Sequence, residues 1–176
     1  MIRRIFDVRP VHLATLAALV VLAGTSSAQA PAPGILNAAQ ASKLLPASVY
    51  FEGQTASTQL RNSAGVRFAD GQLMLAVLVD SSGYSSSVAQ KYQGYLLTGV
   101  PLNLGGQQLG PGAYGMGVVQ GRLYVMDIGN HALFAAPATH DATLHRPVPL
   151  QILAGAQAGT YRLCLGRECI EFHQAQ

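Results

Sequence analysis

The most constraining feature of this sequence is an uncharged apolar run at residues 72–79, Gln-Leu-Met-Leu-Ala-Val-Leu-Val. Turn-forming residues close it on both sides, Asp70-Gly71 before it and residues 80–83 after it. A continuous apolar run of this length between turn signals predicts a strand that is buried on both faces. If Asp70-Gly71 is a two-residue hairpin turn, Val66 lies opposite Leu75 in the preceding strand.

Other short apolar stretches, separated by Gly, Pro, Asp and Ser, predict an all-β chain with about nine strands. The candidate segments for these strands lie at 49–51, 55–62, 66–69, 72–79, 92–98, from 100 onward, 113–119, 122–128, 147–154, 161–165 and 168–172, and neighbouring segments can join into one strand. Two antiparallel sheets packed as a β-sandwich would bury them, and a small closed β-barrel is the alternative. We expect this single β domain to span residues 47–176.

The chain begins with the features of a secretory signal peptide. Arg3 and Arg4 precede an uncharged apolar core at residues 13–24, and Ala28-Gln29-Ala30 has the small-x-small form of a cleavage site. The apolar core is shorter than the roughly 20 residues that span a bilayer, and no later run is longer. We therefore expect residues 1–30 to be removed, the protein to be periplasmic or extracellular, and no membrane insertion after cleavage.

Residues 31–46 are predicted to form a linker and a short helix. Asn37 is a suitable N-cap for a helix over residues 38–45, and Pro46 ends it. From residue 31 onward the chain carries eight Lys and Arg and seven Asp and Glu, so its net charge is 8 − 7 = +1. A chain with so little excess charge offers no basic patch for nucleic acid.

A second hairpin is expected to join residues 113–119 to residues 122–128 through Gln120-Gly121. In that register Gly117 lies opposite Tyr124. A large side chain that lies over a strand glycine stabilises it, so we expect large neighbours to cover Gly117.

The two cysteines are predicted to form a disulfide across the last hairpin. Gly166 suits the first position of a two-residue turn, which places Cys164 directly opposite Cys169. Such a pair has its Cα atoms about 4.5 Å apart, at the near edge of the disulfide range. The same register puts Arg162 opposite Glu171, where we expect an ion pair. A metal-binding pair or a redox-active dithiol is the alternative for the cysteines.

Metal-ligating residue types gather in the long connection after residue 129. His131, His140, Asp141 and His145, together with Asp127, have the chemistry to bind zinc or copper. Their spacing matches no standard metal motif, and the alternative is a set of solvent-exposed loop side chains. Met116 and Met126 would extend a copper site or fill the core.

Four tyrosines suggest a groove for a sugar or a peptide. These are Tyr84, Tyr92, Tyr95 and Tyr124. The alternative is that their rings pack in the core and on the sheet faces, as buried aromatic side chains commonly do.

Residues 106–114 read Gly-x-x-Leu-x-x-Gly-x-Tyr, and Gly159-Thr160-Tyr161 repeats the second half. This element resembles a turn and strand of secreted bacterial domains and of immunoglobulin-like or fibronectin-like sandwiches. The resemblance implies a tyrosine corner, in which the Tyr114 hydroxyl binds nearby backbone. The chain from residue 31 onward also resembles exported β-rich proteins of acidobacterial type. This resemblance implies no particular activity, substrate or catalytic residue.

No serine-hydrolase, zincin or phosphate-binding motif occurs in the sequence. We therefore expect a non-enzymatic binding or structural module of the cell envelope, without a cofactor, with an envelope protein or a polysaccharide as partner. The alternative is a metal-binding protein or metal-dependent enzyme that uses the segment from His131 to His145.

Overall fold

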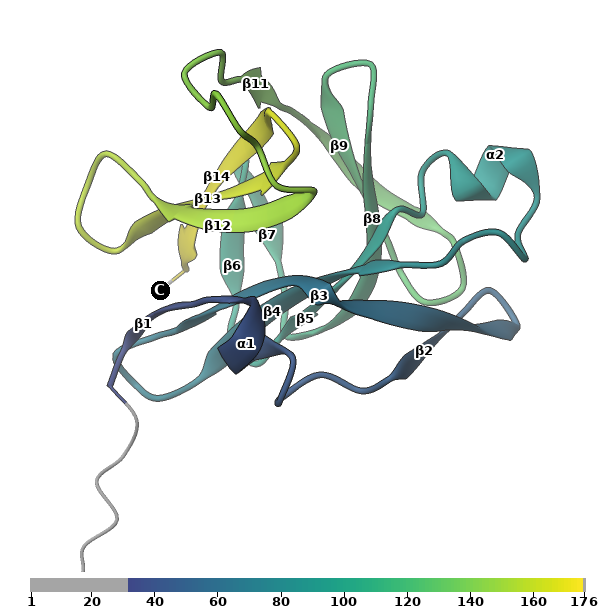
Figure 1. Ribbon diagram of the computed structural model, residues 1–176, viewed down its shortest axis with the longest axis horizontal. Helices are drawn as coiled ribbons and strands as arrows, with labels where there is room; N and C mark the ends of the chain where they lie inside the picture. The colour runs from purple at the N-terminus through teal and green to yellow at the C-terminus, as the bar shows by residue number, and fades with distance from the viewer. Residues whose placement is uncertain (1–31, 176) are drawn as a thin grey trace, which may run out of the picture.

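The structure, a computed structural model, describes residues 32–175, and the expected signal peptide lies outside them. Two antiparallel sheets make up almost all of this part of the chain (Figure 1). The large sheet has the strand order β1-β3-β4-β5-β8-β9-β10, and β2 pairs with β3 beside this path. Its strands are β1 (Gly34–Leu36), β2 (Ser48–Phe51), β3 (Gln54–Arg67), β4 (Leu73–Val79), β5 (Gly94–Thr98), β8 (Gly112–Val119), β9 (Arg122–Met126) and β10 (Ala132–Pro137).

The small sheet has the order β12-β13-β14-β6-β7, and β11 pairs with β14. Its strands are β6 (Leu102–Leu104), β7 (Gln107–Leu109), β11 (Thr139–His140), β12 (Leu150–Ala154), β13 (Thr160–Leu165) and β14 (Glu168–Gln174). Within residues 32–175 the two sheets stay separate, so the sandwich is confirmed and the closed alternative is not formed.

Two short helices accompany the sheets, α1 (Ala38–Ala41) and α2 (Ser86–Ala89). Asn37 caps α1 as expected, and the Gln40 side chain completes a capping box. The helix is shorter than the predicted span of residues 38–45. The linker also contains β1, an edge strand of the large sheet that the sequence pattern did not reveal.

The central strand β4 is buried on both faces, as its unbroken apolar sequence predicts. Met74 and Ala76 belong to an inner core between the two sheets. Leu75 and Val77 point the other way, into an outer cluster on the far side of the large sheet. The large sheet is therefore the middle layer of the molecule, and its outer face is covered by α1, β2 and the connection from β4 to β5.

The turn before β4 differs from the expected one by one residue. Val66 pairs with Met74 rather than with Leu75. The loop has three residues, 69–71, with Gly71 at φ 82° and a hydrogen bond from the Phe68 N–H to the Gln72 carbonyl. A one-residue shift exchanges the two faces of a strand, so Leu75 lies in the outer cluster while Val66 lies in the inner core.

The hairpin between β8 and β9 has the predicted register, with Gly117 opposite Tyr124. The residue over Gly117 is not Tyr124, however. A Cβ atom at this position would lie 2.3 Å from the carbonyl oxygen of Lys91 in the connection from β4 to β5. Gly117 is thus required by a close backbone approach rather than by an aromatic cover.

The last hairpin, β13–β14, has the predicted register throughout. Cys164 pairs with Cys169, their Cα atoms are 4.0 Å apart, and the disulfide is formed. The expected ion pair between Arg162 and Glu171 is wrong. Arg162 instead binds Asp141 at 2.7 Å, because β11 pairs with β14 and the residue that follows β11, Asp141, comes within reach of Arg162.

Candidate functional site

Three of the four tyrosines belong to the outer cluster and form no groove. Tyr92 is fully buried and stacks on Phe51 with the ring centroids 3.9 Å apart. The Tyr84 hydroxyl donates to the Phe51 carbonyl at 3.0 Å, and the Tyr95 hydroxyl donates to a carbonyl of β2 at 3.2 Å. Burial raises the pKa of Tyr92, Tyr84 and Tyr95.

Tyr124 is half-buried and lies under the Lys91 ammonium group, which is 5.2 Å from its ring centroid. The groove hypothesis is therefore wrong for the buried rings, and the packing alternative is correct. By contrast, the expected tyrosine corner is present, since the Tyr114 hydroxyl donates to the Gly110 carbonyl at 2.9 Å.

The structure does not bring the candidate metal ligands together, because each of them is engaged separately. His131 contacts Asp127 at 2.9 Å in the turn before β10, and His140 contacts Glu168 at 2.6 Å across β11 and β14. Asp141 is bound to Arg162, and His145 lies exposed in the following loop. Within residues 32–175, no group of three or more His, Cys, Asp or Glu side chains is placed to hold a metal ion.

The methionines do not extend a metal site either, because they lie on opposite faces of the large sheet. Met116 is in the inner core and Met126 in the outer cluster. Both fill space among apolar side chains, which was the alternative interpretation.

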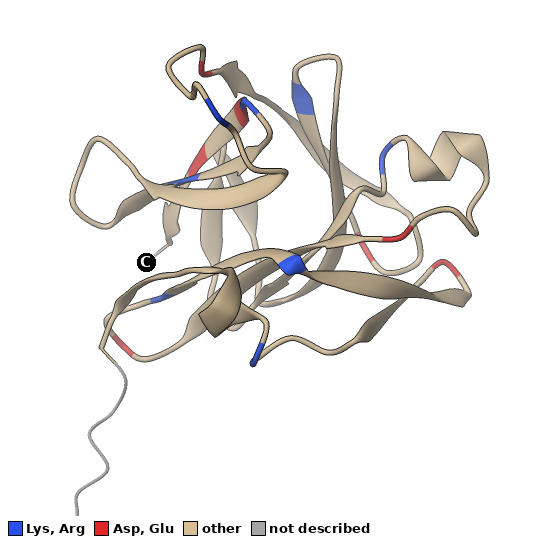
Figure 2. Ribbon diagram, viewed as in Figure 1, with Lys and Arg blue, Asp and Glu red and all other residues tan. Residues whose placement is uncertain are grey.

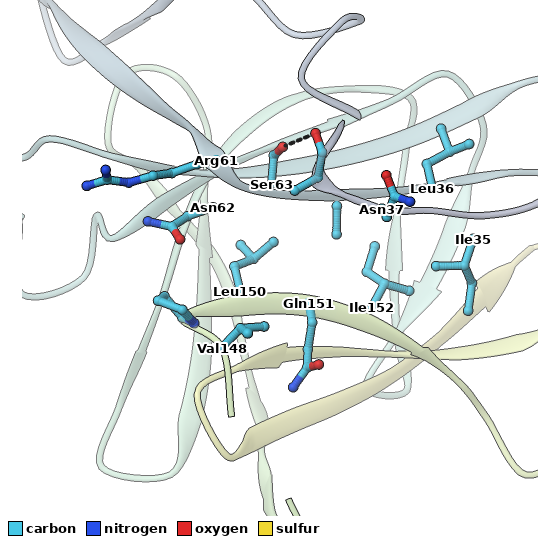
Figure 3. A pocket seen from close by; sticks show the side chains of 13 residues that line it. Ile35, Leu36, Asn37, Arg61, Asn62, Ser63, Val148, Leu150, Gln151 and Ile152 are labelled. Carbon is cyan, nitrogen blue, oxygen red and sulfur yellow. Dashed lines mark hydrogen bonds between the residues drawn. The ribbon is translucent and has the colours of Figure 1, made fainter. Parts of the chain in front are cut away.

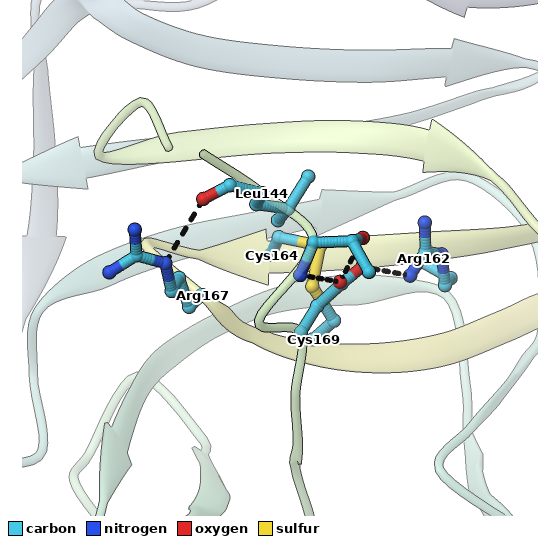
Figure 4. A network of polar contacts seen from close by, with 7 residues as sticks. Leu144, Arg162, Cys164, Arg167 and Cys169 are labelled. Carbon is cyan, nitrogen blue, oxygen red and sulfur yellow. Dashed lines mark hydrogen bonds and ion pairs between the residues drawn. A yellow bond between two sulfur atoms is a disulfide. The ribbon is translucent and has the colours of Figure 1, made fainter. Parts of the chain in front are cut away.

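A polar pocket of about 440 Å³ lies beside the disulfide, between residues 139–143 and the C-terminal hairpin. Its charged groups bind one another. The Thr143 hydroxyl and then Arg162 lower the pKa of Asp141 to about 2, and His140 is held by Glu168. Figure 4 shows the polar contacts beside the disulfide, with Arg162 on one side and Arg167, which donates to the Leu144 carbonyl, on the other. These groups already bind one another, so the pocket offers little to a ligand.

A cleft of about 360 Å³ lies between the two sheets, where β1, α1 and β3 face β12 (Figure 3). Its lining residues are aliphatic or carry an uncharged polar group, with one guanidinium among them. They are Ile35, Leu36, Asn37, Ala38, Arg61, Asn62, Ser63, Ala64, Val148, Pro149, Leu150, Gln151 and Ile152. Ile35 and Val148 are 39% and 47% exposed, so part of the apolar wall is open to solvent.

The local sequence explains why the cleft has this shape. The pairing of β3 with β4 is interrupted between Gln59 and Ser63, so residues 60–62 bulge out of the ladder. The Ser63 hydroxyl donates to the Leu60 carbonyl at 2.6 Å and stabilises the bulge. This brings Arg61 and Asn62 to one end of the cleft, and Figure 3 shows them there, on the wall opposite β12.

The backbone of β12 is not fully paired. The Gly155 N–H bonds to the Thr160 carbonyl, and the Gly166 N–H bonds to the Pro149 carbonyl. Because hydrogen-bonded pairs alternate along an antiparallel ladder, Gln151 and Leu153 also face β13.

Leu150 and Ile152 therefore turn their N–H and C=O groups to the open edge, where no described strand pairs with β12. Both residues are nearly inaccessible, at 4% and 5% exposure, so these backbone groups lie in a recessed position. Buried backbone groups need hydrogen-bond partners, and a ligand in the cleft would supply them.

Arg61 is the one charged residue in the cleft lining. It is exposed, and among residues 32–175 no salt bridge to it is formed. Elsewhere the charged residues are few and scattered over both sheets (Figure 2). The guanidinium is therefore available to a ligand that carries a carboxylate.

The sequence alone does not predict this cleft. Its walls come from residues near 35, 62 and 150, which are far apart in the chain. The sequence marks each wall only by a local feature. One is Pro147 and Pro149 before a short apolar strand, and the other is the polar interruption Arg61-Asn62-Ser63 within a strand.

Comparison of the chain with models of known protein families, with curated proteins and with solved structures found no match. In the described part of the chain, neither helix has the length and apolar character needed to cross a membrane. The resemblance to acidobacterial exported proteins remains a prediction.

Proposed function

We propose that this chain is an exported, non-enzymatic binding module of the cell envelope, and that the cleft between β12 and the β1–β3 side is its ligand site. The observation that carries the proposal is the recessed, unpaired edge of β12 inside an apolar cleft. Buried backbone groups are normally paired within a fold, and an unpaired strand edge is a template for pairing with another chain, so a recessed, unpaired edge points to a partner.

The lining favours binding over chemistry. Aliphatic and amide side chains provide contact area and hydrogen bonds, and the single lining hydroxyl, that of Ser63, already donates to a backbone carbonyl. A volume of about 360 Å³ is at the small end of the range for ligand pockets, which is roughly 300–1,000 Å³. The site therefore suits a short segment of a larger partner.

Export is supported by two independent features. The signal-like pattern ends at Ala30, and the buried disulfide between Cys164 and Cys169 is of the kind that persists in oxidising compartments.

The test is a ligand screen of the chain from residue 31 onward against pooled random peptides and cell-wall oligosaccharides. Val148→Trp fills the mouth of the cleft, and Leu133→Trp is the matched control, because both residues are 47% exposed and Leu133 lies on β10, away from the cleft. We expect binding that Val148→Trp abolishes and Leu133→Trp leaves unchanged, with the bound compound recovered intact.

Two results would refute the proposal. One is a screen in which nothing binds in a manner that Val148→Trp blocks. The other is reproducible turnover of a compound that a single polar substitution abolishes.

A further inference from the structure

We infer that the cleft takes an extended peptide segment that adds as a strand to the free edge of β12 and places a carboxylate on Arg61. This inference rests on the proposed function and specifies its ligand. It follows from three features of the cleft, namely its backbone edge, its apolar wall and its single cation.

The backbone edge has the repeat of a partner strand. Leu150 and Ile152 are two residues apart, which is about 6.6 Å along a strand, and each presents one donor and one acceptor. An extended peptide offers donors and acceptors at the same two-residue repeat, so it can satisfy both residues at once. A compact ligand such as a sugar ring does not have this repeat.

The apolar wall determines which peptide side chains are favoured. Successive side chains of an extended segment point to opposite faces. Figure 3 shows Leu150 and Ile152 pointing from β12 toward the β1–β3 side, while Gln151 points away. A bound segment in the plane of β12 would therefore turn every second side chain toward Ile35 and Leu36, and we expect small or aliphatic residues there.

The cation determines the orientation of the ligand. Arg61 and Asn62 lie at one end of the cleft and Ile35 at the other (Figure 3). A guanidinium binds a carboxylate through paired hydrogen bonds, and an amide neighbour adds a further donor. The peptide therefore carries its carboxylate, either an acidic side chain or its own C-terminus, at the Arg61 end.

The recessed position of the edge favours a single segment over a second copy of this chain. Leu150 and Ile152 are almost inaccessible, so the flat edge of another folded sheet does not reach their backbone groups. A single extended tail or protruding loop is narrow enough to enter the cleft that these two residues line.

The experiment uses heptapeptides selected from a random phage-displayed library against the immobilised chain from residue 31 onward. The tightest peptide is resynthesised with a fluorescent label, and binding is measured by anisotropy. A series of variants carries an N-methyl group at one position each, which removes one donor. Strand addition predicts that methylation weakens binding about tenfold at alternate positions and has little effect at the positions between.

Two protein variants test the cation. Arg61→Gln is expected to weaken binding at least tenfold, whereas Lys43→Gln, which removes an exposed charge outside the cleft, leaves it unchanged. A peptide amidated at its C-terminus, and one with Glu replaced by Gln, identify which carboxylate Arg61 binds. If both peptides still bind as tightly as the original peptide, Arg61 does not bind a carboxylate of the ligand, and this part of the inference is refuted.

The outcomes separate this inference from the proposed function. A peptide that Val148→Trp displaces but that shows no alternation in the N-methyl series refutes strand addition and leaves the cleft as a binding site. If an oligosaccharide binds in the cleft and no peptide is selected, strand addition is likewise refuted and the cleft is still a binding site. A peptide whose binding is indifferent to Val148→Trp refutes both.

Discussion

Phe51 and Gly115 provide a sharp test of how the outer cluster is built. Phe51, at the end of β2, is fully buried and stacks on Tyr92. It also lies directly on β8, because a Cβ atom at Gly115 would be only 2.4 Å from the Phe51 ring. Real Cβ atoms do not approach other atoms so closely, so Gly115→Ala requires the ring to move.

The magnitudes follow from these contacts. Phe51→Ala should lower the free energy of unfolding by about 3–5 kcal/mol, as expected for a buried aromatic ring. Gly115→Ala alone should lower it by about 1–3 kcal/mol through overpacking. In the Phe51→Ala background the overlap is gone, and Ala in a strand interior is favoured over Gly by roughly 0.5–1 kcal/mol. The double variant should therefore be about as stable as Phe51→Ala alone, or slightly more stable.

Urea unfolding of the four proteins, with the disulfide intact, measures the coupling between the two positions. We expect a coupling free energy of about 2 kcal/mol. Gly83→Ala is a control, because a Cβ atom there would have a single neighbour, at 3.7 Å, and its φ needs no glycine. Additive effects of Phe51→Ala and Gly115→Ala would show that the ring does not lie on the glycine.

Three further predictions concern the rest of the fold. Leu75→Asp should prevent folding, because it buries an unpaired charge in the middle layer, and a soluble variant with an unchanged melting temperature would refute this. Cys164→Ser should weaken the last hairpin by about 2 kcal/mol without abolishing the fold, since the disulfide closes a short loop. This is measured by urea unfolding, and the bond itself by mass spectrometry after alkylation without reduction. Hydrogen bonds from Thr143 and Arg162 lower the pKa of Asp141 from 3.8 to about 2. The stability that its carboxylate contributes is therefore present above about pH 4 and is lost as the pH falls toward 2. In Asp141→Asn the free energy of unfolding should therefore change less steeply with pH between about 4 and 2.

The sequence predicts the structure best where short-range geometry alone determines the register of a hairpin. The last hairpin was predicted residue by residue, because a two-residue turn at Gly166 leaves only one register and the disulfide follows from it. The turn before β4 differs by one residue from the prediction, because Asp70-Gly71 also fits a three-residue loop with Gly71 in the left-handed region. Both loops have the same sequence signal.

The sequence revealed much less of what lies over the large sheet. The sequence is compatible with either a ligand groove or core packing for Tyr84, Tyr92 and Tyr95. Only the packing of β2 and of the connection from β4 to β5 over that face decides between the two. The cleft depends likewise on β12 meeting a bulge in β3, which is about 90 residues away in sequence. Periodicity does not report which faces of distant strands meet.

The most direct test of the account is amide hydrogen exchange along β12, measured by NMR for the free chain and for its complex with the selected heptapeptide. The free edge predicts an alternation, in which the amides of Gln151 and Leu153 are protected while those of Leu150 and Ile152 exchange faster. Addition of the peptide should protect Leu150 and Ile152 selectively. Equal protection of all four amides in the free chain, or no change at Leu150 and Ile152 on binding, would contradict the account.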